Sequence, residues 1–224
     1  MLKKLFQKLL ISSGKEYVVD TAIPDRLICS FVFGRVVMVV RGFIKTRRKI
    51  FLGKQVNILN TKNFTFGKSC TIERNVKIDC YSKDKITFGE VVKIGAYSTI
   101  STTSHMSKYG KGLSIGNNSA IGEYSYLGCS GGVEIGNDVI MGQYISFHSE
   151  NHNFSDSSKL IREQGVTSKG IKLGDNIWVG SKVTFLDGCS VGNNSVVAAG
   201  AVVNGIFPEN VIIGGVPAKV IKAL

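Results

Sequence analysis

A six-residue apolar repeat, which runs without a slip from Leu173 to Val203, is the feature that most constrains the fold of this chain. Counted from its leading apolar residue, the segment reads LGDNIW, VGSKVT, FLDGCS, VGNNSV and VAAGAV. The leaders are Leu173, Val179, Phe185, Val191, Val197 and Val203. A period of six fits neither an α-helix nor a lone strand, but it fits a solenoid whose coil has three flat sides of six residues. The repeat therefore predicts an all-β fold, a β-solenoid.

The same six-residue spacing recurs upstream in groups of three. The leaders are Phe66, Ile72, Ile78; Phe88, Ile94, Ile100; Ile115, Ile121, Leu127; and Ile135, Met141, Phe147. Every insertion follows the third side of a coil, and the longest runs from Asn151 to Gly170. Because an insertion at a corner leaves the strand register intact, we expect all of them to emerge, stacked, at one corner of the prism. Before these coils, Leu52, Ile58 and Phe64 predict an irregular first coil.

The solenoid needs a cap at each end, because each coil buries its apolar row only against its neighbours. We expect residues 1–50 to form a basic helical region at one end, residues 51–224 to form the solenoid domain, and residues 204–224 to cap the other end. The apolar stretch from Leu27 to Val40 is 14 residues long and contains Arg35. This length predicts a helix packed on the protein or lying on a membrane surface, and not one that crosses a bilayer.

The formal net charge of +12 is concentrated near the N-terminus, where residues 1–50 hold eleven Lys or Arg against three acidic residues. Attraction to anionic lipid headgroups is one explanation, and a solvated face that covers the solenoid end is the other. Nucleic acid is disfavoured, because the aromatic residues there do not interleave with the basic ones. No secretory signal is recognised at the N-terminus, since residues 1–10 lack a long apolar run and a cleavage site.

The five cysteines show no zinc-ligand spacing, which predicts no metal site. Cys70 and Cys189 occupy the small inward position of their hexads and are expected to serve packing. Free thiols in this pattern indicate a reducing compartment, so we expect a cytoplasmic location, with peripheral contact at the inner face of the membrane if the N-terminus binds lipid.

The hexads, the loop that holds His152, the GDNIWVG segment and the closing GGVPAKVI together resemble the hexapeptide-repeat acyltransferases. The similarity is greatest to the branch that acetylates sugars in bacterial surface polysaccharide synthesis (capsule, O-antigen or exopolysaccharide), and it covers residues 50–224. It implies a left-handed parallel β-helix, a homotrimer, and acetyl-CoA bound as co-substrate between adjacent subunits. It also implies that 148–170 is the active-site loop.

The resemblance matches His152, in the motif SENHNFSD, to the catalytic histidine of the family. A neutral histidine is suited to removing the proton of an acceptor hydroxyl near neutral pH. His148, Glu150 and Asn151 are candidates for supporting the base or binding the acceptor, and Ser149 and Asp156 lie beside them without an assigned role. His105 lies two coils away, so we expect no contact with His152 within one subunit.

The resemblance also indicates a surface for coenzyme A. An outward Trp178 at a corner matches a residue that lines the acetyl-CoA site, although packing between subunits explains it equally well. Small residues that would keep the outer wall shallow for a pantetheine arm are Gly180, Ser181, Ala198, Ala199 and Gly200. Lys219, helped by Lys222, is expected to meet the phosphates of coenzyme A.

Several functions stay open at this point. The favoured one is O-acetylation of a sugar hydroxyl by direct attack, with His152 as general base. The alternative acceptors are a nucleotide-linked amino sugar and an antibiotic hydroxyl. A zinc-dependent carbonic anhydrase would need three converging histidines, which the distant His105 disfavours. A non-catalytic binding solenoid would need only the repeat.

Overall fold

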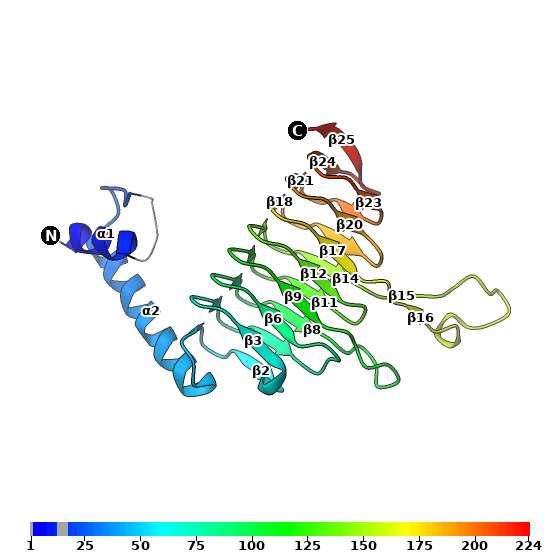
Figure 1. Cartoon of the computed structure of the whole chain (residues 1–224), viewed down its shortest axis with the longest axis horizontal. Helices are drawn as coiled ribbons and strands as arrows, with labels where there is room; N and C mark the ends of the chain where they lie inside the picture. Colours follow the sequence, from blue (N-terminus) through cyan, green and yellow to red (C-terminus); the bar gives the residue numbers. More distant parts are fainter. Residues whose placement is uncertain (1, 13–17) are drawn as a thin grey trace.

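The computed structural model, which describes residues 2–12 and 18–224, confirms the solenoid: the chain winds into a left-handed parallel β-helix with three flat faces (Figure 1). Residues 1 and 13–17, which belong to the predicted N-terminal region, lie outside the described residues. Face A consists of β1 (Phe51–Leu52), β4 (Thr71–Ile72), β7 (Lys93–Ile94), β10 (Ala120–Ile121), β13 (Ile140–Met141), β18 (Ile177–Val179), β21 (Ser195–Val197), β24 (Val211–Gly214) and β25 (Lys219–Ala223).

The other two faces follow the same order. Face B consists of β2 (Asn57–Leu59), β5 (Lys77–Asp79), β8 (Thr99–Ser101), β11 (Tyr126–Gly128), β14 (Ser146–His148), β19 (Thr184–Leu186) and β22 (Val202–Val203). Face C consists of β3 (Phe64–Phe66), β6 (Ile86–Phe88), β9 (Leu113–Ile115), β12 (Val133–Ile135), β17 (Ile171–Leu173), β20 (Ser190–Val191) and β23 (Ile206–Phe207).

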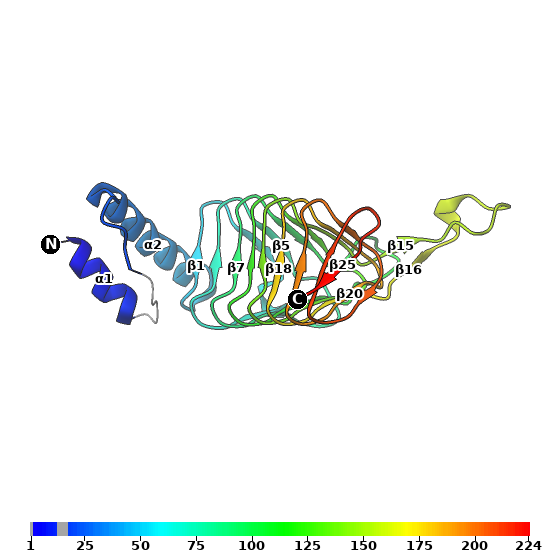
Figure 2. The same cartoon turned by 90° about the horizontal axis from the view of Figure 1, so that it is seen from above.

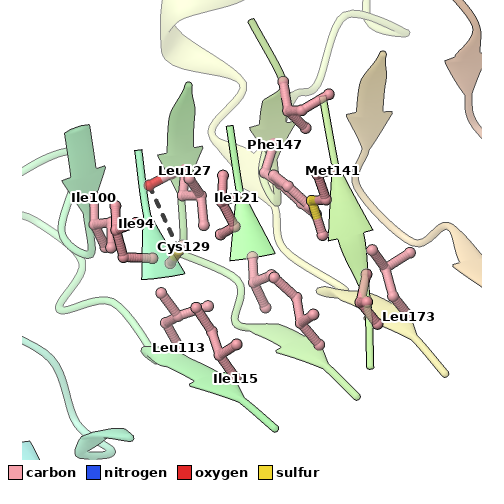
Figure 3. Close-up of a cluster of buried hydrophobic side chains, with 14 of the residues drawn as sticks. Ile94, Ile100, Leu113, Ile115, Ile121, Leu127, Cys129, Met141, Phe147 and Leu173 are labelled. Atoms are coloured by element: carbon pink, nitrogen blue, oxygen red, sulfur yellow. Dashed lines mark hydrogen bonds between the residues drawn. The ribbon is translucent and has the colours of Figure 1, made fainter. Parts of the chain in front are cut away.

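The predicted leaders stack in register along each face. On face B, Leu127 pairs with Phe147 and Phe147 pairs with Phe185, whose rings stack with centroids 4.7 Å apart. Figure 3 shows leaders of successive coils pointing into one apolar core, together with Cys129, whose thiol donates to the Leu127 carbonyl. Because each leader is buried by the coils before and after it, the six-residue period determines the core directly.

Two of the three corners are tight and hold residues in the left-handed backbone region, such as Tyr144 between faces A and B and Asn194 between faces C and A. A hydrogen-bonded ladder of Asn117, Asn137 and Asp175 runs along the C–A corner. The third corner, between faces B and C, carries every insertion, as predicted. This B–C corner lies opposite face A, which decides the geometry of the site.

Two helices precede the solenoid, α1 (Leu2–Ser12) and α2 (Asp25–Thr46), and lie beyond its first coil (Figures 1 and 2). The length predicted for the apolar stretch was wrong, because α2 has 22 residues and is long and apolar enough to cross a membrane. The helix continues past Val40 because Arg41 and Lys45 direct their charges to carbonyl oxygens of the first coil.

The C-terminal stretch, predicted as a cap over residues 204–224, begins as further solenoid. β23 pairs with β20 on face C and β24 pairs with β21 on face A, so the coil continues to Gly214. β25 then turns back antiparallel to β24 and covers the last strand of face A. The strand edge that the solenoid would otherwise expose is thereby paired.

Candidate functional site

The insertion that holds His152 forms a hairpin that projects from the B–C corner (Figures 1 and 2). β15 (Asn151–His152) pairs antiparallel with β16 (Val166–Thr167), and His152 lies opposite Val166. The side chains of Asn151 and His152 are both exposed. An exposed imidazole on a short two-stranded ribbon is accessible to a substrate approaching from outside the prism.

The outer part of the hairpin is held by its own polar side chains and the short 3₁₀ helix η2 (Ile161–Glu163). Gln164 Nε2 donates to the Asp156 carbonyl (2.8 Å), and Asn153 Nδ2 donates to the Gln164 carbonyl (3.0 Å). The hydroxyl and backbone N–H of Ser158 donate to Asp156, and these hydrogen bonds lower the pKa of the Asp156 carboxyl. The carboxylate of Asp156 is therefore engaged in forming the turn.

The base of the hairpin is fixed by two buried polar residues. Ser149, which had no assigned role, is buried: its Oγ donates to the Gly128 carbonyl (2.8 Å) and accepts from the Gly131 N–H (2.9 Å). Asp187, which the sequence did not single out, accepts from the backbone N–H groups of Lys169 (2.7 Å) and Gly170 (2.8 Å). These contacts hold both ends of the loop on the solenoid.

Glu150 joins this loop to the insertion of the second coil. Its Oε1 accepts from Ser104 Oγ (2.8 Å) and its Oε2 accepts from Ser168 Oγ (3.4 Å), while Lys108 Nζ donates to the same Ser168 hydroxyl (2.7 Å). The two insertions therefore meet although they are two coils apart in the stack, because the third coil turns this corner in a few residues. His105 itself hydrogen-bonds Ser107 through Nδ1.

The meeting of the insertions leaves an open polar cavity at the B–C corner. Its volume is ≈ 380 Å³. The lining residues are Lys83, Asp84, Lys108, Tyr109, Lys111, Ser130, Gly131 and Ser168. Hydroxyls, ammonium groups and a carboxylate on one wall suit a ligand with many hydrogen-bonding groups, such as a sugar.

His148 points outward on face B, as predicted, and lies beside the same corner. Its Nε2 is 2.8 Å from Ser146 Oγ, and its ring packs against Tyr126 with centroids 5.8 Å apart. Both contacts are to neighbours on face B and not to the hairpin. His148 is therefore held on the outer surface of face B by Ser146 and Tyr126, apart from the hairpin that carries His152.

The residues predicted to hold coenzyme A lie on face A or directly beside it. Trp178 is 57% exposed and lies in the middle of β18, between Ile140 of β13 and Val196 of β21, and not at a corner as expected. The outward side chains of these three residues form an apolar row across face A. An indole exposed in such a row offers a flat surface to a ligand or to another subunit.

The small residues beside Trp178 have packing roles of their own. A Cβ at Gly180 would lie 2.5 Å from the Ala199 nitrogen, so only glycine fits between these coils. Ser181 donates to the Gln143 carboxamide (3.2 Å), and Gly200 adopts a φ of 73°. Ala198 packs against the position of Gly214, under β25. Tight coil packing alone therefore explains the small residues at these positions.

Lys219 opens β25 and pairs with Gly214, with its side chain exposed at the end of face A. Lys222 pairs with Ile212 in the same hairpin and is also exposed. Neither lysine forms a salt bridge within the described residues. Both ammonium groups are therefore available to an anion.

The candidate residues fall into two groups on opposite sides of the prism. His152 and Glu150 belong to the B–C corner, whereas Trp178 and Lys219 belong to face A, which that corner does not touch (Figure 1). One chain therefore does not bring the predicted base and the predicted coenzyme surface together. Among residues 2–12 and 18–224, no group of three or more His, Cys, Asp or Glu side chains is placed to hold a metal ion.

Comparison with known proteins gives one family match and relatives that align with most of the chain. Residues 170–205 match the model described as bacterial transferase hexapeptide (six repeats). The "putative lipopolysaccharide biosynthesis O-acetyl transferase WbbJ" of Escherichia coli K12 is 28% identical, and the match covers 81% of this chain and 88% of that relative. The probable acetyltransferase Rv3034c of Mycobacterium tuberculosis is 28% identical over 80% of this chain, which spans 51% of that relative.

Among solved structures, a hexapeptide-repeat containing acetyltransferase of Vibrio cholerae, complexed with acetyl coenzyme A, is similar in fold. The TM-score is 0.50 at 18% identity, and the match covers 97% of this chain and 98% of the other. This likeness confirms the β-helix as a shared architecture.

Proposed function

We propose that this chain is a hexapeptide-repeat acyltransferase and that it transfers an acetyl group from acetyl-CoA to a sugar hydroxyl, a proposal that its repeats and its relatives support. The acceptor belongs to bacterial surface polysaccharide synthesis, in keeping with the name of the E. coli relative. The observation that carries the proposal is the exposed His152 on its own hairpin, at the corner where the insertions form a polar cavity.

His152 acts as the general base in a direct transfer. Its neutral imidazole takes the proton of the acceptor hydroxyl as the oxygen attacks the thioester carbonyl. The C–S bond then breaks, and coenzyme A leaves as a thiol after receiving a proton from the imidazolium. Backbone N–H groups stabilise the oxyanion of the tetrahedral intermediate. This sequence of steps needs no covalent acyl-enzyme.

The division of the site between a corner and the opposite face supports assembly between subunits. In a homotrimer with cyclic symmetry, the B–C corner of one subunit meets the face A side of the next, so that His152 faces the neighbour's coenzyme surface. Trp178 then packs against the pantetheine arm, and Lys219 meets the phosphates of coenzyme A. A single protomer is inactive on this account.

The first test measures release of coenzyme A thiol from acetyl-CoA with a panel of sugars, lipid-linked saccharides and nucleotide-linked amino sugars. Replacing His152 by Ala should lower kcat by roughly 10²- to 10⁴-fold, the usual contribution of a general base. His148→Ala is the matched control and should retain most of the activity, because its ring contacts face B and not the hairpin.

The panel also separates the alternatives. Turnover confined to amino sugars would favour N-acetylation over the proposed O-acetylation. Absence of turnover together with absence of coenzyme A binding by calorimetry would contradict the enzyme and favour a binding solenoid. An unfolding transition at the wild-type temperature in each variant shows that lost activity is not lost fold.

A further inference from the structure

The outward side of α2 carries an apolar stripe that the rest of the described chain leaves uncovered. Phe33, Val36, Val40, Phe43 and Ile44 follow one another at intervals of 3, 4, 3 and 1, which places them on one side of a helix. Each is more than half exposed, with Phe33 at 71% and Ile44 at 69%. A soluble helix normally turns such a stripe toward the core.

The opposite side of α2 binds the first coil through polar and charged groups. Arg35 donates to Thr71 Oγ1 (3.0 Å) and lies 3.5 Å from the centre of the Phe51 ring. Arg41 donates to the Leu52 carbonyl (2.8 Å), and Lys45 donates to the Val56 carbonyl (2.6 Å). The helix is therefore amphipathic in the reverse sense, with its charges toward the protein and its apolar side chains outward.

Charge at both ends of the stripe identifies what covers it. Arg26 lies seven residues before Phe33, which places it on the apolar side of α2, and Arg47 caps the C-terminal end of the helix; both side chains are exposed. On α1, Lys4 and Lys8 are exposed beside Leu5 and Ile11. Apolar side chains flanked by cations are the arrangement with which interfacial helices bind anionic lipid.

An apolar hollow lies at the same end of the molecule, between α1 and α2. Its volume is ≈ 410 Å³, and Phe6, Val18, Ile23, Leu27 and Phe31 are among its lining residues. Leu27 and Phe31 lie on a different side of α2 from the stripe, so the hollow is a separate feature of this end.

We propose that α1 and α2 dock this protein on an anionic lipid surface, with the stripe Phe33, Val36, Val40, Phe43 and Ile44 inserted among the acyl chains. The helix lies in the plane of the interface and does not cross the bilayer. Crossing would separate Arg35, Arg41 and Lys45 from their partners on the first coil and place them in hydrocarbon. The inference is independent of the chemistry proposed for His152.

The test uses the full chain labelled at Cys29 with an environment-sensitive fluorophore. Cys29 is exposed and lies four residues before Phe33, on the same side of α2. The other cysteines, Cys70, Cys80, Cys129 and Cys189, are buried, and burial raises the pKa of Cys80 and of Cys189 to about 12. A raised pKa keeps these thiols protonated and unreactive at about pH 8, so the label is selective.

Vesicles of phosphatidylcholine mixed with phosphatidylglycerol should shift the emission to the blue and carry the protein into the pellet, whereas pure phosphatidylcholine should bind far less. Each of Arg26→Gln and Arg47→Gln should weaken binding on the order of fivefold. Phe33→Ser should weaken it by about tenfold or more. Ile206→Ser is the matched control, because Ile206 is 82% exposed on the far coil.

Two outcomes overturn the proposal. If vesicles change neither the emission nor the sedimentation, and Phe33→Ser instead alters the oligomeric mass in solution, the stripe packs against a second copy of the chain. If the bound protein resists alkaline extraction and needs detergent for release, α2 crosses the bilayer. Acetyl transfer to a small soluble sugar should be unchanged in Arg26→Gln, Arg47→Gln and Phe33→Ser. Failure of the lipid-binding proposal would therefore leave the proposed function standing.

Discussion

At the scale of single residues, the proposed chemistry depends on the side chains that hold the His152 hairpin as well as on His152 itself. Asp187 fixes the backbone where the hairpin returns to the solenoid, and Glu150 ties its first strand to the insertion of the second coil. Neither contact involves the imidazole. Both restrict where His152 can lie, which is what a general base in the proposed reaction requires.

Replacing Asp187 by Ala should lower the free energy of unfolding by about 2 kcal/mol, because charge-assisted hydrogen bonds to two backbone N–H groups are lost at a buried site. Limited proteolysis should then cut within residues 151–168 faster than in the wild type. Asp187→Asn keeps an acceptor oxygen and should lose less stability. Equal stability and equal proteolysis in the Ala variant would show that the carboxylate does not anchor the hairpin.

At the scale of elements, the hairpin that holds the proposed base leaves the solenoid at the B–C corner and is separate from the packed coils. The coils before and after the hairpin pair without a break, since Phe147 pairs with Phe185 on face B and Ile135 pairs with Leu173 on face C. The insertion between them contributes no leader to the core. The third coil shows that the same corner closes with only a few residues, Cys129 to Gly132, between β11 and β12.

Residues 149–170 can therefore be replaced by the four residues of the third coil's corner, because Gly128 pairs with His148 and Val133 pairs with Ile171. We expect the shortened chain to keep its β-type circular dichroism and unfold cooperatively, while acetyl transfer is lost. A shorter connection costs less closure entropy, whereas loss of the Asp187 hydrogen bonds to Lys169 and Gly170 costs about 2 kcal/mol, so we expect the shortened chain to be less stable but still folded. Persistent activity in this variant would place the base outside the hairpin.

At the scale of the whole molecule, the six-residue period predicted the core, the three faces and the corner that carries the insertions, because each leader is buried by local stacking. The meeting of the Ser104 and Glu150 loops was not predicted, since it depends on how far two insertions reach past the short third corner. The length of α2 was missed because Arg41 and Lys45 look like the end of an apolar helix until their partners on the first coil are known.

The separation of His152 from Trp178 was already implicit in the repeat. Phe147 leads the third side of its coil and Val179 leads the second side of the next, so the residues that follow Phe147 leave at the corner opposite Trp178. The repeat does not show which neighbouring subunit surface would bring His152 and Trp178 together. The central claim is therefore that each active site combines the hairpin of one subunit with face A of its neighbour.

The measurement that tests this claim most directly is activity in mixed oligomers of His152→Ala and Trp178→Ala chains, purified after co-expression through two different tags. Each variant alone should be strongly impaired. A trimer that contains both variants always has one site of three that pairs an intact hairpin with an intact face A, so activity should return to about a third of wild type. No recovery in the mixed oligomers, with coenzyme A still bound, would contradict a site shared between subunits.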